Sequence, residues 1–285
     1  MKKANFISKT AERYKHNRKF EFNYLRTLLF CRHSQQEKKA IEAYQNKHQG
    51  QVGVIIANGP SLNSINFEHL KQFVTIGANR IYLLYDRCDF RPTYYCLEDH
   101  MVAEDNAAEI SSLESSVMFI PKDLSYCISG NRNILYTNLV RRYKGAKQIS
   151  SFSTDFSEKA YWGGTVTYYA LQLAYYLGFK KVYIVGLDHS YSRPDYAKGK
   201  NKITSQGADV NHFDPRYFGK GKRWHAPDNL VDRMETSYRI AKKVFEESGR
   251  QIINATPNSK LGEDVFPKID FGSIPECVNI KTKIK

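Results

Sequence analysis

Two histidines and two tyrosines in one polar stretch of the chain have the side chains best suited to group transfer. His212 and His225 are candidate general bases, because an imidazole that titrates near neutral pH can remove a proton from a sugar hydroxyl. Tyr191 and Tyr196 are candidate donors to a departing phosphate, since phenolic hydroxyl groups can bind phosphate oxygens without a metal ion. The spacing of the histidines, with His189 before them, matches no common zinc-ligand pattern, so we predict no metal site among them.

A second candidate site follows an apolar, β-branched run at residues 52–57, which reads as a buried strand. The turn after it is Asn58, Gly59, Pro60 and Ser61, and we expect Ser61 to cap a helix. A strand, a glycine turn and a helix start leave backbone N–H groups free to bind phosphate, and Gly59 lets the phosphate approach. Asn58 can donate and accept, which suits a ribose or a base edge. The pattern is neither GxGxxG nor a Walker loop.

More polar residues follow the other expected strands. They are Asn79, Glu98, Asp99 and Asp188. Because ligands bind at the carboxyl ends of strands in open α/β sheets, we expect these side chains to meet the glycine turn. Gly164 and Thr165 open a strong helical run, so they form another helix start able to hold phosphate or carboxylate. The three carboxylates could instead hold Mg²⁺ against a triphosphate.

The elements that position these residues alternate between strand and helix, which predicts an α/β, Rossmann-like fold with a mostly parallel sheet and helices on both faces. We expect this catalytic domain at residues 51–275, with loop or lid insertions at 122–157 and 190–227. Long irregular loops inside a compact domain are usually functional or disordered. A basic helical extension at 1–50 and a basic tail at 276–285 would flank the domain.

The formal net charge of +14 is concentrated at the N-terminus, where residues 1–50 hold twelve Lys and Arg against four Asp and Glu. Residues 9–32 interleave basic with aromatic and aliphatic side chains, as a basic amphipathic helix does. Such a helix either lies on an anionic membrane surface or packs on the main domain with a solvated basic face. No nucleic-acid-binding motif accompanies the charge, so we do not expect nucleic acid as a partner.

The cysteines and the apolar runs of the sequence predict where in the cell the protein is located. Its five cysteines show no CxxC spacing, which favours a reducing compartment without disulfides or a zinc knuckle. No signal-peptide pattern opens the chain, and no run approaches the roughly 18 apolar residues of a membrane span. We predict a cytoplasmic protein, peripheral on the inner face of the cell membrane if the basic helix binds lipid.

The strand and turn at residues 52–62, residues 178–188 and residues 256–259 resemble two related groups of proteins. One is the MptE-like Rossmann family, named for an archaeal hydroxymethyl-dihydropterin pyrophosphokinase and common in bacterial surface-glycan loci. The other comprises the bacterial sialyltransferases that use CMP-sialic acid. The resemblance covers about residues 51–271 and leaves the basic N-terminus outside.

Each resemblance implies roles for particular residues. The sialyltransferase resemblance implies that Tyr196 binds phosphate, that His225 is the general base, and that no separate cofactor is needed. It implies a cytidine nucleotide on Asn58, Gly59, Ser61 and Asn79. This chain departs from the pattern at the other phosphate tyrosine, which falls on Ser190, with Tyr191 one place away. The archaeal resemblance implies Mg-ATP at the same turn, with Asp188 and Glu98 or Asp99 near the metal.

We therefore predict a glycosyltransferase that moves a sugar, for example a nonulosonate such as sialic acid, from a CMP-activated donor to a glycan or lipid-linked acceptor. This places the protein in bacterial polysaccharide or lipopolysaccharide biosynthesis. The alternatives are a diphosphokinase of the 6-hydroxymethylpterin type, which needs Mg²⁺ and ATP, and a non-catalytic protein that binds nucleotide or glycan.

Overall fold

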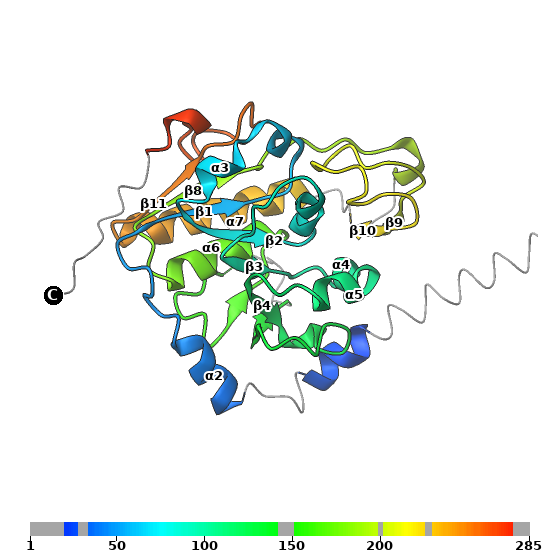
Figure 1. Cartoon of the computed structure of the whole chain (residues 1–285), viewed down its shortest axis with the longest axis horizontal. Coiled ribbons are helices and arrows are strands. Elements are labelled where there is room, and N and C mark those ends of the chain that lie inside the picture. The colour runs from blue at the N-terminus through cyan, green and yellow to red at the C-terminus, as the bar shows by residue number, and fades with distance from the viewer. Residues whose placement is uncertain (1–19, 28–33, 142–150, 199–201, 226–229, 276–285) are drawn as a thin grey trace, which may run out of the picture.

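The computed structural model describes residues 20–27, 34–141, 151–198, 202–225 and 230–275 (Figure 1). Within them, a seven-stranded sheet has the order β11-β8-β1-β2-β3-β4-β5, and every neighbouring pair is parallel. Its strands are β1 (Val52–Ile56), β2 (Val74–Ala78), β3 (Tyr94–Cys96), β4 (Val117–Pro121), β5 (Ile134–Thr137), β8 (Lys181–Val185) and β11 (Gln251–Asn254). The predicted α/β, Rossmann-like fold is confirmed.

The sheet is apolar because both of its faces are covered. In β1, β2, β4 and β8, four of the five residues are buried, so these strands read as continuous rather than alternating apolar runs. The chain runs outward from β1 to β5 and then returns to place β8 on the other side of β1. Ligands of open α/β sheets bind at such a reversal of strand order. The fold therefore directs attention to the carboxyl ends of β1 and β8.

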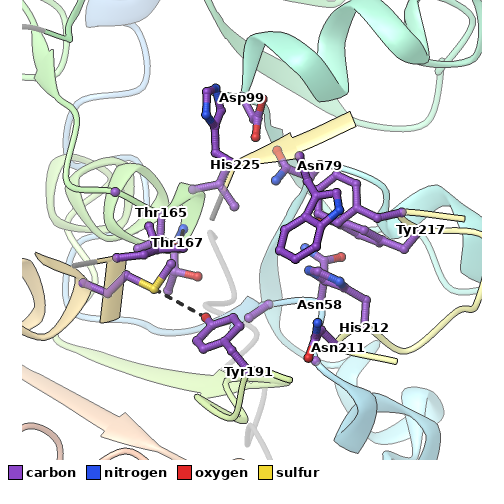
Figure 2. A pocket seen from close by; sticks show the side chains of 18 of the residues that line it. Asn58, Asn79, Asp99, Thr165, Thr167, Tyr191, Asn211, His212, Tyr217 and His225 are labelled. Atoms are coloured by element: carbon purple, nitrogen blue, oxygen red, sulfur yellow. Dashed lines mark hydrogen bonds between the residues drawn. The ribbon is translucent and has the colours of Figure 1, made fainter. Parts of the chain in front are cut away.

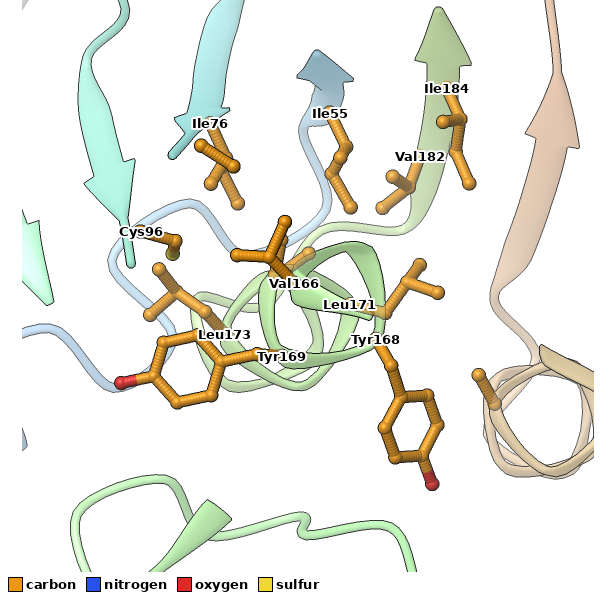
Figure 3. Close-up of a cluster of buried hydrophobic side chains, with 14 of the residues drawn as sticks. Ile55, Ile76, Cys96, Val166, Tyr168, Tyr169, Leu171, Leu173, Val182 and Ile184 are labelled. Atoms are coloured by element: carbon orange, nitrogen blue, oxygen red, sulfur yellow. The ribbon is translucent and has the colours of Figure 1, made fainter. Parts of the chain in front are cut away.

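One face of the sheet is covered by α6 (Val166–Tyr176), in which every residue except Tyr175 is buried. Figure 3 shows side chains such as Ile55 and Ile184 pointing from the sheet toward this helix. Thr165 caps α6, since its hydroxyl accepts from the Thr167 amide at 3.3 Å. The amphipathic α7 (Leu230–Glu247) packs on α6 and β11. Because α6 begins at Val166 with Thr165 as its cap, the predicted helix start after Gly164 is confirmed.

The other face is covered by short elements. They are η1 (Pro60–Ser64), α3 (Phe67–Leu70), η2 (Ile81–Asp86), α4 (His100–Asp105), α5 (Ala107–Ser111) and η3 (Lys122–Leu124). The prediction that Ser61 caps a helix is wrong. Gly59 occupies the cap position of a five-residue 3-10 helix with Pro60 at its start, and α3 follows as a separate helix. Proline fixes its own φ and lacks an N–H, but it does not determine how far the helix continues.

Residues 190–198 and 202–225 lie outside the seven-stranded sheet and contain η4 (Asp195–Ala197) and an antiparallel pair, β9 (Lys202–Thr204) and β10 (Arg223–His225). Two shorter strands, β6 (Leu139–Val140) and β7 (Ala160–Tyr161), form a separate parallel pair, and η5 (Phe271–Ser273) lies near the end of the described chain.

The N-terminal residues that the structure describes pack against the sheet domain. A helix spans residues 20–27, and α2 (Gln35–Glu42) begins with a capping box between Ser34 and Glu37. Ile41 of α2 is buried in the core. The rest of the predicted basic extension and the predicted tail at 276–285 lie outside the described residues. Across the described ranges, no helix combines the length and the apolar character needed to cross a membrane.

Candidate active site

A pocket of about 390 Å³ opens at the carboxyl ends of β1, β2, β3 and β8. It gathers all four predicted chemical residues, His212, His225, Tyr191 and Tyr196. Most of the other predicted site residues also line it: Asn58, Gly59, Asn79, Glu98, Asp99, Gly164, Thr165 and Asp188. Pro60 and Ser61 do not line it. The topology thus brings together residues that are up to 167 positions apart in the chain, counting from Asn58 to His225.

The pocket has two walls that face each other (Figure 2). One wall carries Asn58, Asn79 and His212, beside Tyr217. The opposite side carries Thr165 and Thr167 from the start of α6, together with Tyr191. At one end lie Asp99 and His225. A ligand in the pocket would therefore contact amide and imidazole groups on one side and hydroxyl groups on the other.

The glycine turn is built differently from the predicted phosphate corner. The Gly59 amide donates to the Gly186 carbonyl at 2.8 Å, and the Ser61 amide donates to Asp188 at 3.0 Å. The Ser61 hydroxyl donates to the other Asp188 carboxylate oxygen at 2.7 Å. Two of the amides expected to be free are therefore occupied. A Cβ on Gly59 would lie 1.9 Å from Asp188, so the glycine makes room for this carboxylate.

Asn58 and Asn79 each present a buried amide oxygen that has no hydrogen-bond partner among the described residues. The Asn58 Nδ2 group donates to the Ala78 carbonyl at 3.2 Å, which fixes the side chain across the ends of β1 and β2. Asn79 has a φ of 48° in the left-handed region, and backbone in that region is enriched at ligand sites. An unpaired buried acceptor costs about 1–3 kcal/mol, so these oxygens suit N–H or O–H donors of a ligand.

His212 forms a dyad with the buried carboxylate of Asp209, since Nδ1 lies 2.7 Å from Oδ2. The Asp209 carboxylate also accepts from the amides of Asn211 at 2.7 Å and Phe218 at 2.9 Å. Burial would raise the pKa of Asp209, but the hydrogen bonds from His212 and these amides bring it below its usual range. An ionised Asp209 places the imidazole proton on Nδ1, which leaves Nε2 as the basic nitrogen.

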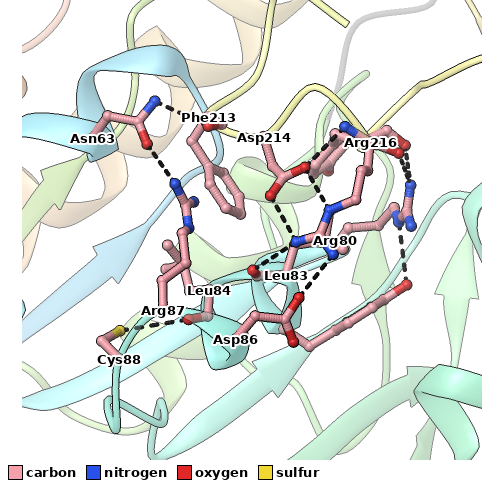
Figure 4. Close-up of polar contacts among 12 residues, drawn as sticks. Asn63, Arg80, Leu83, Leu84, Asp86, Arg87, Cys88, Phe213, Asp214 and Arg216 are labelled. Atoms are coloured by element: carbon pink, nitrogen blue, oxygen red, sulfur yellow. Dashed lines mark hydrogen bonds and ion pairs between the residues drawn. The ribbon is translucent and has the colours of Figure 1, made fainter. Parts of the chain in front are cut away.

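The His212 ring is also held by stacking, with its centroid 3.8 Å from that of Tyr217 and an angle of 2° between the planes. The backbone around it is clamped to η1 and η2 (Figure 4). Asn63 donates to the Phe213 carbonyl at 2.9 Å, and buried Arg80 donates to the carbonyls of Arg216 and Tyr217. These contacts hold the histidine-bearing loop in one position against the strand ends.

Asp209 and Arg80 are absent from the predicted site residues. For Asp209, the one local signal is its position three residues before His212, which places the two side chains within reach in a turn. Arg80 follows Asn79 directly, but the loop carbonyls to which it donates lie more than 130 positions away, at Arg216 and Tyr217. Only the folded chain shows that it anchors the loop.

The other predicted hydroxyl and imidazole groups lie elsewhere in residues 190–198 and 202–225. His225 ends β10, and its ring centroid lies 5.4 Å from that of His100. The Tyr191 hydroxyl donates to the Met234 sulfur at 3.4 Å, and the Tyr196 hydroxyl accepts from the Gln206 amide at 3.3 Å. The Tyr191 contact is a weak hydrogen bond to sulfur, which a phosphate oxygen could replace.

The three carboxylates predicted for Mg²⁺ are each engaged elsewhere. Asp188 holds Ser61, and Asp99 caps α4 by accepting from the Met101 amide at 2.7 Å. Glu98 is buried and lies 3.4 Å from Arg141, whose guanidinium pairs more closely with Asp123, at 2.5 and 3.0 Å. In the part of the chain that the structure describes, no group of three His, Cys, Asp or Glu side chains is placed to hold a metal ion. Each of the three carboxylates thus already has a hydrogen-bond or ion-pair partner within the chain.

Glu98 gives a pH-dependent prediction for stability. Burial raises the pKa of Glu98 to about 8, so the folded protein keeps this proton while the unfolded chain, with the usual value of 4.5, releases it. The free energy of unfolding should therefore fall as the pH rises from about 4.5 to about 8. Glu98→Gln mimics the protonated form and should gain stability relative to the wild type across this window. Urea unfolding at about pH 4.5 and at about pH 8 measures the difference in stability between the variant and the wild type. An equal difference at the two pH values would contradict the raised pKa of Glu98.

Comparison with known proteins gives one family match and one similar solved structure. The model of the family described as 6-hydroxymethylpterin diphosphokinase MptE-like matches residues 26–194. Among solved structures, the MAf glycosyltransferase from Magnetospirillum magneticum AMB-1 is similar, with 14% identity and a TM-score of 0.47 over 85% of this chain. This chain spans only 39% of that one, and so distant a likeness says nothing about activity. No curated protein matches the chain in sequence.

Proposed function

The chain belongs to the MptE-like family, and we propose that its pocket transfers a sugar from a nucleotide-activated donor to a glycan acceptor. The proposed donor is a CMP-linked sugar such as a nonulosonate, and the proposed acceptor is a cell-surface glycan. The observation that carries the proposal is the Asp209–His212 dyad, which shares one pocket wall with the unpaired amide oxygens of Asn58 and Asn79. A candidate general base and two buried hydrogen-bond acceptors thus line the same pocket.

The proposed reaction assigns one task to each group. The amide oxygens of Asn58 and Asn79 accept hydrogen bonds from the nucleoside, and the hydroxyls of Tyr191 and Tyr196 donate to the phosphate. His212 Nε2 takes the proton of the acceptor hydroxyl while the new bond forms between that oxygen and the anomeric carbon. The bond from that carbon to the phosphate oxygen breaks, and its electron pair leaves with the nucleoside monophosphate.

A diphosphokinase is the second candidate, because the family description carries that activity. It would require Mg-ATP in the same pocket. The carboxylates assigned to the metal are engaged by Ser61, by the start of α4 and by Arg141, which favours the sugar transfer. The third candidate is a protein that binds nucleotide or glycan without catalysis. In that case no transfer activity should be detected, with or without His212.

The choice of ligand can be tested by thermal unfolding of the full chain with CMP, CDP, UDP, GDP and ATP, each with Mg²⁺ and with EDTA. A ligand that binds only the folded state stabilises it by about 2.7 kcal/mol at a concentration 100 times its Kd, so the melting temperature should rise clearly with CMP or CDP. We expect this rise to persist in EDTA. A rise with ATP that requires Mg²⁺ would overturn the proposal and favour the diphosphokinase.

A further inference from the structure

The N-terminal helix at residues 20–27 forms part of the pocket wall, although most of it precedes the family match. Phe20, Glu21 and Tyr24 line the pocket. The Phe20 ring stacks on His100 with a centroid distance of 4.1 Å and an interplanar angle of 16°. The Arg141 guanidinium lies 5.4 Å from the same ring. One face of the helix is therefore fixed to the end of the pocket where His225 lies.

The opposite face of this helix is exposed and apolar. Phe22 is 67% exposed and Leu25 is 48% exposed, and their spacing of three residues places them on the same side. Among the described residues, only two other large hydrophobic side chains, Tyr191 and Val210, are similarly exposed. The helix at residues 20–27 thus packs on the domain through Phe20 and Tyr24 and exposes Phe22 and Leu25 to solvent.

The sequence next to this face is strongly basic. Residues 1–19 contain seven Lys and Arg against one acidic residue, and exposed Arg26 adds a further positive charge on the helix itself. Exposed aromatic and aliphatic side chains that neighbour clustered positive charge in the sequence fit the interface of an anionic lipid layer, which attracts basic residues. This charge complementarity points to lipid headgroups rather than to an apolar protein partner.

We propose that the Phe22–Leu25 face of the N-terminal helix docks on an anionic membrane surface and holds the pocket beside it. The helix is then shared between two contacts, with Phe20 and Tyr24 facing the pocket and Phe22 and Leu25 facing lipid. The membrane contact stands independently of the reaction. Its consequence, that the acceptor glycan is carried on a lipid, rests on the proposed sugar transfer.

The test is co-sedimentation of the full chain with vesicles, without any nucleotide. Vesicles of phosphatidylcholine alone are compared with vesicles in which part of the lipid is phosphatidylglycerol. The wild type should sediment with the anionic vesicles only, and Phe22→Ser/Leu25→Ser should partition about tenfold or more weakly, because the apolar contribution is lost. Val210→Ser, a matched loss of an exposed apolar side chain that is 65% exposed, should bind like the wild type.

Two outcomes would overturn the proposal: no binding of the wild type to anionic vesicles, or equal binding of the wild type and the double variant. Because both replaced side chains are exposed, the double variant should melt at the wild-type temperature, and Phe22→Ser alone replaces it if it does not. The nucleotide-induced rise in melting temperature is measured separately. Failure of vesicle binding with an intact CMP response would refute the docking face alone, and the reverse would refute the sugar transfer alone.

Discussion

Replacing His212 with alanine should lower the turnover number of the proposed transfer by about 10²- to 10⁴-fold, the usual contribution of a general base. The melting-temperature rise caused by the nucleotide should remain, because the amide oxygens of Asn58 and Asn79 are unchanged. The expectation rests on the 2.7 Å contact between His212 Nδ1 and Asp209, which makes Nε2 the basic nitrogen of the ring. Steady-state release of nucleoside monophosphate, measured with the donor identified by the ligand screen, gives the turnover number.

Asp209→Asn and His225→Ala are the matched comparisons. Asp209 acts through His212, so Asp209→Asn should lower the turnover number while the KM for the donor stays close to the wild-type value. A purely structural role would instead change both constants and the melting temperature. His225→Ala should retain most of the activity. If His225→Ala abolishes transfer and His212→Ala does not, the base is His225, as the sialyltransferase resemblance implies.

The fold could be predicted from the sequence because its central elements are locally self-consistent. The runs at β1 and β8 are short, β-branched and bounded by glycine or polar turns, which is what a strand buried on both faces requires. The α6 helix has a threonine cap at one end and Gly178 with a φ of 91° just after the other. By contrast, the length of the helix after Gly59 depends on tertiary packing, and there the prediction fails.

The candidate site was predictable only as far as topology determines it. Residues that follow parallel strands meet at one edge of the sheet, so Asn58, Asn79 and Asp188 could be grouped from their positions alone. What each group does depends on partners that local patterns do not reveal. Asp188 accepts hydrogen bonds from Ser61, and the backbone around His212 is anchored by Arg80, which is distant from it in the chain.

Gly59→Ala is expected to destabilise the protein rather than only to weaken nucleotide binding. The new Cβ would lie 1.9 Å from Asp188 Oδ2 and 2.7 Å from the Gly186 carbonyl oxygen, which is far inside contact distance. Overpacking typically costs about 1–3 kcal/mol, and displacing the Asp188 carboxylate would also disrupt hydrogen bonds of a charged group worth about 1.5–3 kcal/mol each. We therefore expect a loss of at least about 3 kcal/mol in the free energy of unfolding.

Urea unfolding of Gly59→Ala and Gly272→Ala separates the two possible reasons for a glycine in this turn. A Cβ added at Gly272 would meet no atom within 4 Å, and the φ of this residue is not positive, so Gly272→Ala should unfold like the wild type. If Gly59 served only to let a phosphate approach, Gly59→Ala would keep its stability and lose nucleotide affinity. If Gly59→Ala instead loses stability in the absence of nucleotide, the glycine is required by the contact between Asp188 and Ser61. This contact joins the ends of β8 and β1 before any ligand binds.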